Sequence, residues 1–202
     1  MKGSLVIVGF FVAGIVVGVL HLMPMPQFDW LSNVSYITLC ALIFLVGFMI
    51  GNDVEIFQKF RSLNRLYMLL PLMTIVGTLA GCAITTTLLP HRSLSDCLAV
   101  GSGMGYYSLS SVLITQSKGA ELGTIALLAN IVREVITLLG APLMVKWFGK
   151  LAPISVGGAT TMDTTLPILT NACGKDFVIV SIFHGFIVDF SVPFLVTFFC
   201  EL

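Results

Sequence analysis

The chain has 202 residues, of which 57% are hydrophobic and 10% are charged, and its formal net charge is zero. A soluble domain carries about 25% charged residues, so this chain has too little charge to cover a soluble surface, and nothing in its charge points to nucleic acid. Long continuous hydrophobic runs exclude a β-barrel of short alternating strands. We therefore expect an all-α polytopic membrane protein with about five transmembrane helices plus two broken or re-entrant helices, in one transporter domain over residues 1–202.

The N-terminal half contains three long hydrophobic runs. The first, over 3–22, is long enough for a membrane span, because twenty residues at 1.5 Å each cover about 30 Å. It is too long for the hydrophobic region of a typical signal peptide. Its Gly14 and Gly18 are spaced for close helix packing. Further helices are predicted over 34–50 and 67–89.

The loop between the second and third predicted helices is the most basic one, with Lys59, Arg61 and Arg65. Cytoplasmic loops of membrane proteins carry an excess of lysine and arginine. This loop is therefore predicted to be cytoplasmic, which places the N-terminus in the cytoplasm and the C-terminus outside.

The segment 95–117 is the first one that does not resemble an ordinary span. Its run 101–105 holds three glycines, and hydroxyl side chains such as Ser108 and Ser110 follow. Glycine is a poor helix former, and unwound backbone is not tolerated in contact with lipid. The pattern predicts a broken or re-entrant helix, although an ordinary helix with a small-residue packing face stays open as an alternative. No strand precedes the glycines and no βαβ unit follows, so a dinucleotide-binding turn is not expected.

A long helix is predicted over 122–147, with Asn130, Arg133 and Glu134 near its centre. Adjacent helical residues point about 100° apart, so Arg133 and Glu134 do not neutralise each other side by side. Asn130 shares a face with each of them, at spacings of three and four residues. These residues are candidates for a transport site, and a structural ion pair with another helix is the alternative.

The run 157–167 is the segment around which we expect the site to be organised. It opens with two glycines, closes with a proline, and places four threonines around Asp163. Glycine and proline favour a second broken helix. A carboxylate inside the membrane is costly and indicates a functional site, so Asp163 is predicted to be its centre.

The last helix is predicted over 175–199 and carries His184, Asp189 and Pro193. A single histidine inside a membrane protein is as often a hydrogen-bonded core residue as a site residue. A central carboxylate such as Asp189 needs water or a partner. The five cysteines are scattered without metal-ligand spacing. The chain has no ATP-binding motif, so a primary pump is not expected. No metal, cofactor or catalytic residue is predicted.

Four runs of the C-terminal half together resemble the bacterial lysine exporter LysO family: GSGMGYYSLSSVLITQS, NIVRE, GGATTMDTTLPIL and HGFIVDFSVPFLVTFF. The resemblance spans nearly the whole chain and is dense from Ala99 onward. It implies a multi-pass exporter of L-lysine and analogues such as thialysine in the bacterial inner (plasma) membrane. It also implies that Glu134 and Asp163 are essential. Familiar members carry extra spans ahead of what is here Gly3, and Asp189 stands where we expect a small neutral residue.

The two broken segments, with their glycines, hydroxyls and a carboxylate, resemble the binding site of a secondary transporter. In such transporters, half-helix ends and unwound backbone near the membrane midplane bind the substrate and the coupling ion. Carboxylates suit the two ammonium groups of lysine, and Arg133 or half-helix N-termini suit its carboxylate. Burial favours protonation of a carboxyl group, so proton antiport is one coupling and sodium coupling is equally compatible. The residues predicted to bind substrate or ion are Ser108, Ser110, Asn130, Arg133, Glu134, Thr160, Asp163, Thr164, His184 and Asp189.

Three other functions are considered at this point. Asp163 and Asp189 suggest an intramembrane aspartyl protease dyad, but the YD and GxGD signatures of that class are absent, so we do not expect an enzyme. A non-transporting membrane subunit and a transporter of another small organic cation or amino acid are the alternatives. We further expect the chain to pair with a second copy or with a small membrane partner, and the helix carrying Gly14 and Gly18 is a candidate contact.

Overall fold

The computed structural model describes residues 65–89 and 91–202, together with the single positions 16 and 37. Contacts divide the chain into two units, Met1–Asn52 and Asp53–Leu202, and the helices described below belong to the second. The helices predicted over 3–22 and 34–50, the Gly14 and Gly18 contact, and the basic residues Lys59 and Arg61 lie outside the described residues. The single-domain prediction stays a prediction.

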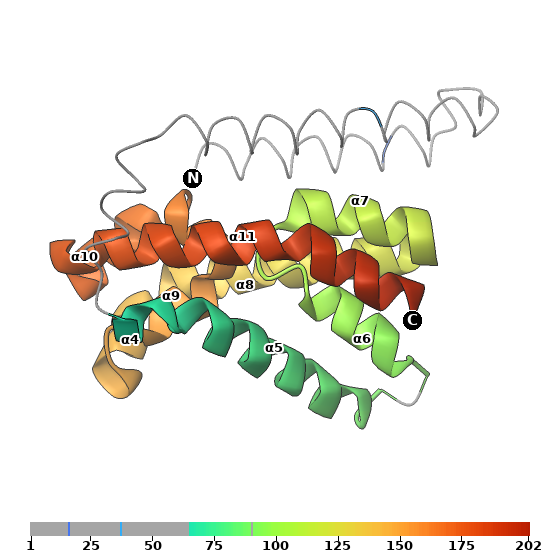
Figure 1. The fold of residues 1–202 in the computed structure, drawn as a ribbon, viewed down its shortest axis with the longest axis horizontal. Coiled ribbons are helices and arrows are strands. Elements are labelled where there is room, and N and C mark those ends of the chain that lie inside the picture. Colours follow the sequence, from blue (N-terminus) through green and yellow to red (C-terminus); the bar gives the residue numbers. More distant parts are fainter. Residues whose placement is uncertain (1–15, 17–36, 38–64, 90) are drawn as a thin grey trace. The chain divides into compact units, whose positions relative to one another are not determined.

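The described part of the chain is all-helical, as predicted, and contains no strand (Figure 1). Its α-helices are α4 (Arg65–Met68), α5 (Leu70–Thr86), α6 (Leu94–Gly101), α7 (Tyr107–Lys118), α8 (Ala120–Phe148), α9 (Ala152–Gly157), α10 (Leu166–Cys173) and α11 (Val178–Glu201). Two short 3-10 helices, η1 (Gly158–Met162) and η2 (Lys175–Phe177), follow α9 and α10.

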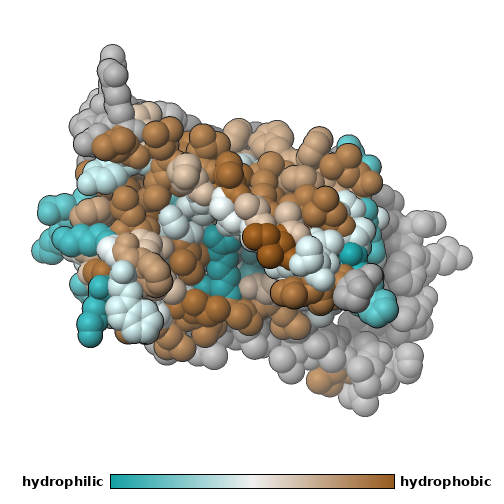
Figure 2. All heavy atoms as spheres, turned by 90° about the horizontal axis from the view of Figure 1, so that it is seen from below, coloured by the Kyte–Doolittle hydropathy of each residue, from teal (hydrophilic) through white to brown (hydrophobic). Residues whose placement is uncertain are grey.

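Three helical stretches are long and apolar enough to cross a membrane: Leu66–Thr86, Ala120–Phe148 and Lys175–Glu201. They coincide within a few residues with the helices predicted over 67–89, 122–147 and 175–199. Many of their large apolar side chains are exposed, up to 80% for Leu139, as lipid-facing positions require. The face seen in Figure 2 is mostly hydrophobic, with hydrophilic residues at its two ends and in a central hollow.

The segment 95–117 is interrupted as predicted, because the chain leaves the helix between Gly101 and Tyr107. Met104 (φ 43°) and Gly105 (φ 97°) adopt left-handed backbone conformations at this point, which reverse the chain direction. The two half-helices then run back side by side. Asp96 in the first turn of α6 lies 3.7 Å from Lys118 at the end of α7. We call this pair of half-helices the first hairpin.

The run around Asp163 forms a second hairpin, made of α9 with η1 as one arm and α10 as the other. The ammonium group of Lys150, just before α9, lies 5.2 Å from the ring centroid of Phe177, just after α10. Both ends of this hairpin therefore lie together. The two hairpins are attached to opposite ends of α8, whose 29 residues at 1.5 Å each span about 44 Å. They extend toward each other along that helix (Figure 1).

The tips of the two hairpins touch backbone to backbone. The amide of Ala159 donates a hydrogen bond of 2.9 Å to the carbonyl of Met104. Gly158, in a left-handed conformation (φ 62°), lies so close to the same carbonyl that a Cβ atom there would overlap it. Gly105 also lies close to the second hairpin, since a Cβ atom on it would be 3.1 Å from the Gly157 carbonyl oxygen. Glycine at the tips therefore permits the contact between the hairpins.

This contact leads to a first prediction. Gly158→Ala is expected to lower the free energy of unfolding by about 1–3 kcal/mol more than Gly174→Ala. Both glycines have positive φ angles, but a Cβ atom on Gly174 meets nothing within 4 Å. The control therefore carries the backbone strain of alanine without the clash. Thermal unfolding of the purified variants in detergent measures the difference, and equal midpoints for the two variants would contradict the tip contact.

Candidate functional site

Asn130 joins the centre of α8 to the tip of the first hairpin. Its Oδ1 accepts a hydrogen bond of 2.7 Å from the Gly105 amide. Its Nδ2 donates to the Ala126 carbonyl at 2.8 Å and to the Ser110 hydroxyl at 3.4 Å. The side chain is buried, so these bonds form in a low-dielectric interior where an unpaired amide would be costly. Asn130 thus fixes the unwound backbone that the glycines create.

Arg133, nearly one turn further along α8, binds the second hairpin in the same way. Its Nε donates to the Val156 carbonyl at 2.7 Å and its Nη2 to the Ser155 carbonyl at 3.1 Å. Carbonyls in the last turn of a helix lack helical partners and carry partial negative charge. A structural role for Arg133 was one predicted alternative, and these bonds support it, although they go to backbone carbonyls rather than to a carboxylate.

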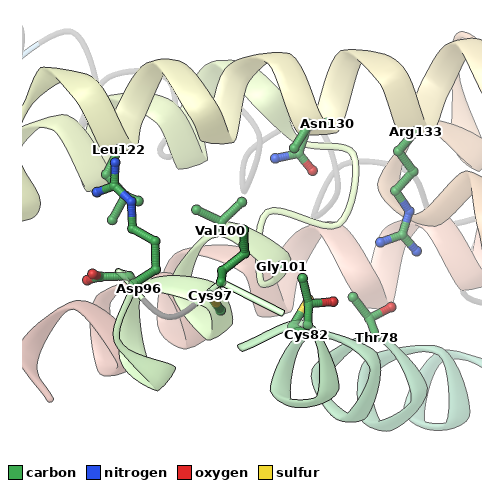
Figure 3. Close-up of a pocket in the computed structure, with 13 residues that line it drawn as sticks. Thr78, Cys82, Asp96, Cys97, Val100, Gly101, Leu122, Asn130 and Arg133 are labelled. Carbon is green, nitrogen blue, oxygen red and sulfur yellow. The ribbon is translucent and has the colours of Figure 1, made fainter. Parts of the chain in front are cut away.

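A pocket of about 240 Å³ opens between α5, α6 and α8. It reaches from Asp96, near the outer end of the first hairpin, to Asn130 and Arg133 beside the tips (Figure 3). Thr78 and Cys82 of α5 lie across from Arg133 in this view. At the outer end, Arg92 forms an ion pair with Glu121. Of the ten predicted site residues, Asn130 and Arg133 line this pocket.

Glu134 points away from Arg133 around α8, as the helical geometry predicted. It is 3% exposed and interacts electrostatically with the phenol of Tyr107. Tyr107 also interacts with Asp163 of the second hairpin. The structure thus places Glu134 and Asp163 around a tyrosine that begins α7.

Asp163 follows η1 at the break of the second hairpin and is exposed. Its carboxylate accepts a hydrogen bond from the backbone amide of Thr164, which is also exposed. Thr160 instead points inward, where its hydroxyl donates to the Gly157 carbonyl at 2.9 Å and lies 3.2 Å from the Thr165 hydroxyl. The inner threonines stabilise the tip, and Asp163 projects from it.

His184 is fully buried on α11 and connects three elements. Its Nε2 lies 2.9 Å from the Thr74 hydroxyl of α5, and its Nδ1 lies 3.2 Å from the Thr161 hydroxyl of η1. The Thr161 hydroxyl also contacts the carbonyls of Gly158 and Ser181, at 2.8 and 2.9 Å. Its single proton can serve only one of these acceptors, so the direction of the bond between Thr161 and Nδ1 depends on the tautomer of His184. The structure therefore places His184 in the hydrogen-bonded core.

Asp189 lies one turn beyond the part of α11 that contacts η1, and it is 6% exposed. It interacts electrostatically with Asp163, and the phenol of Tyr106 interacts with both carboxylates. Acidic residues from three different elements thus interact electrostatically with the two tyrosines that follow the first break.

The ten predicted residues fall into groups with different surroundings. Glu134 interacts electrostatically with Tyr107, Asp189 interacts with Tyr106, and Asp163 interacts with both tyrosines. Asn130, Arg133, Ser110, Thr160 and His184 hold the hairpins together, whereas Ser108 and Thr164 are exposed. Sequence reasoning missed Tyr106 and Tyr107. Their position directly after the glycine run was a signal, since the first residues after a break lie at the hairpin tip.

The sequence model of a family described as "Lysine exporter LysO" matches residues 8–200. "Lysine exporter LysO" of Escherichia coli (strain K12) is 34% identical over 196 residues, which cover 97% of this chain and 64% of that protein. A proposed lysine exporter of Haemophilus influenzae is 32% identical over 174 residues, covering 85% of this chain and 88% of that protein. The chain thus spans less than two thirds of the length of the Escherichia coli relative. No solved structure matches the chain.

The buried position of His184 leads to a second prediction. His184→Ala removes two side-chain hydrogen bonds and leaves a cavity, so it is expected to lower the free energy of unfolding by about 2–4 kcal/mol. We expect it to weaken transport less than neutralising Glu134 or Asp163. His91→Ala, at an exposed position, is the matched control. Thermal unfolding and vesicle transport are measured on the same preparations. Complete loss of transport with an unchanged unfolding midpoint would place His184 in the transport path instead.

Proposed function

The chain belongs to the lysine exporter LysO family, and we propose that it is a secondary active exporter of L-lysine and analogues such as thialysine. The family is one of transporters rather than enzymes, and the three spans identify a membrane protein. One observation carries the proposal. Two interrupted helices reach toward each other from opposite ends of α8, and their tips meet beside buried carboxylates. Secondary transporters bind substrate and ion at such half-helix ends near the membrane midplane.

We propose that both hairpins are re-entrant, each entering and leaving the membrane on one side. The contacts between Asp96 and Lys118 and between Lys150 and Phe177 support this, since each joins the two ends of one hairpin. Full crossings would place those ends on opposite sides of the membrane. Together with the predicted helices over 3–22 and 34–50, the proposal is five spans plus two re-entrant hairpins.

The distribution of basic residues supports one orientation in the bacterial inner membrane. Lys146, Lys150 and Lys175 lie near the outer end of the second hairpin. At the other end of the bundle, Arg92 and Lys118 are each paired with an acidic residue. The positive-inside rule then places the first of these ends in the cytoplasm. The end of α11 lies outside in this orientation, because Cys200 interacts with Ser117 and Lys118 of the first hairpin.

Lysine carries two ammonium groups and one carboxylate, and the residues around the tips complement this pattern. We propose that Glu134 and Asp163 receive the ammonium groups, because both are carboxyl side chains that interact electrostatically with Tyr107. The substrate carboxylate is assigned to Arg133, whose guanidinium reaches the pocket, and to the N-terminal end of α7, where the helix dipole favours an anion.

Coupling to protons or to sodium fits this arrangement equally well. A buried carboxylate exchanges its proton for a cationic substrate when both compete for it, which makes the exporter an antiporter. Carboxylates and hydroxyls are also hard oxygen ligands for sodium. Association with a second copy or with a small membrane partner likewise remains a proposal. Transport of another small organic cation, or a non-transporting role, is the outcome if the next experiment fails.

The third prediction tests the function directly. Asp163→Asn and Glu134→Gln keep the shape of each side chain and remove its charge, so each is expected to abolish lysine transport while the protein still inserts. The measurement is uptake of radiolabelled L-lysine into inverted vesicles, with and without imposed proton and sodium gradients. Glu201→Gln, at the exposed end of α11, is the control. Wild-type rates in either acid variant would remove that residue from the site, and no uptake by the wild type under either gradient would overturn the function.

A further inference from the structure

The lysine site proposed above does not include the carboxylate of Asp189. It is 6% exposed, yet no described residue donates a hydrogen bond to it or forms an ion pair with it. A buried carboxylate without a partner is costly. A proton or a bound cation removes this cost.

The packing of α11 shows where this carboxylate lies. A Cβ atom on Gly185 would lie 2.7 Å from the Met162 amide nitrogen and 2.7 Å from the Thr161 hydroxyl. The helix therefore rests directly on the backbone at the end of η1. Residues four apart share one helix face, so Asp189 lies one turn beyond this contact on the same face. Asp163 is the residue after Met162, so the two acidic residues lie on adjacent elements at the break.

Among the described residues, no basic side chain forms an ion pair with either carboxylate. They interact electrostatically with each other, and like charges at short range destabilise the ionised pair. Arg133, the basic side chain at the tips, donates to the carbonyls of Ser155 and Val156. His184, one turn earlier on α11, is held by Thr74 and Thr161. The phenol of Tyr106 is the remaining polar group that interacts with both carboxylates.

We propose that Asp163 and Asp189 together bind one monovalent cation at the tip of the second hairpin, with the Tyr106 phenol oxygen as a further ligand. Two carboxylates attract a single positive charge more strongly than one, and carboxylate and phenol oxygens accept hydrogen bonds from an ammonium group or coordinate sodium. The cation is the terminal (side-chain) ammonium group of the substrate or a free sodium ion. The ammonium alternative rests on the proposed function, whereas the sodium alternative does not.

The experiment measures cation binding by the full chain in nanodiscs. The midpoint of thermal unfolding is followed as sodium chloride replaces choline chloride at constant ionic strength, and separately as L-lysine is added. Norleucine, which lacks the terminal ammonium group, is the control for lysine. We expect sodium or lysine to raise the wild-type midpoint. Asp189→Asn and Asp163→Asn are each expected to raise the half-effective concentration of that cation about tenfold or more. Glu201→Gln is expected to leave it unchanged.

Each outcome decides the proposal. A response to sodium identifies the free ion, and a response to lysine but not to norleucine identifies the ammonium group. Wild-type responses in Asp189→Asn, or no response of the wild type to either cation, would overturn the site. If Asp189→Asn does not fold, Asp189→Ala places a small neutral residue there and is expected to show the same loss. Lysine transport is measured on the same preparations. If the wild type transports lysine but Asp189→Asn does not weaken cation binding, this inference is overturned and the proposed function stands. If sodium binding depends on Asp189 but the wild type does not transport lysine, the proposed function is overturned and this inference stands.

Discussion

An interrupted helix inside a membrane leaves backbone amides and carbonyls that lipid cannot satisfy. In this protein the two interruptions satisfy each other. The Ala159 amide donates to the Met104 carbonyl, and α8 supplies the remaining partners through Asn130 and Arg133. The two hairpins and α8 therefore depend on one another. Removing either hairpin would leave the tip of the other with unpaired backbone groups. Glycine is required at 158 for this reason, since a Cβ atom there would overlap the Met104 carbonyl, and at 105 a Cβ atom would make a tight contact with the Gly157 carbonyl.

The helical geometry of α8 distributes charge around these tips. Arg133 and Glu134 are adjacent in sequence and point about 100° apart, so one reaches the pocket and the carbonyls of α9 while the other faces Tyr107. Asp163 and Asp189 add negative charge on the tyrosine side. A zwitterion with an additional ammonium group complements this arrangement of one cation and several carboxylates. The proposed export of lysine depends on this pattern of charge more than on the shape of any pocket.

Local patterns in the sequence were sufficient for the three spans that the structure describes and for both interruptions, because glycine runs and proline act on their own segment. They were not sufficient to predict whether the chain reverses at each break. A helix that breaks and turns back has the same amino-acid composition as a broken helix that crosses the membrane. The partners of Asn130 and His184 also escaped prediction. Asn130 bonds to a residue 25 positions away, and His184 bonds to one 110 positions away, and no local periodicity encodes such contacts. Tyr106 and Tyr107 acquire their role only from the tips that meet beside them.

The sidedness of the hairpin ends tests the central claim, that both hairpins enter from opposite faces and meet inside the membrane. In a background without the native cysteines, single cysteines replace Ser93 and Lys118 at the ends of the first hairpin, and Lys150 and Lys175 at the ends of the second. Intact cells are treated with a membrane-impermeant thiol reagent. We expect labelling at 93 and 118, and labelling at 150 and 175 only after permeabilisation. Opposite accessibility of 93 and 118, or of 150 and 175, would show a full crossing and contradict the structure proposed for the site.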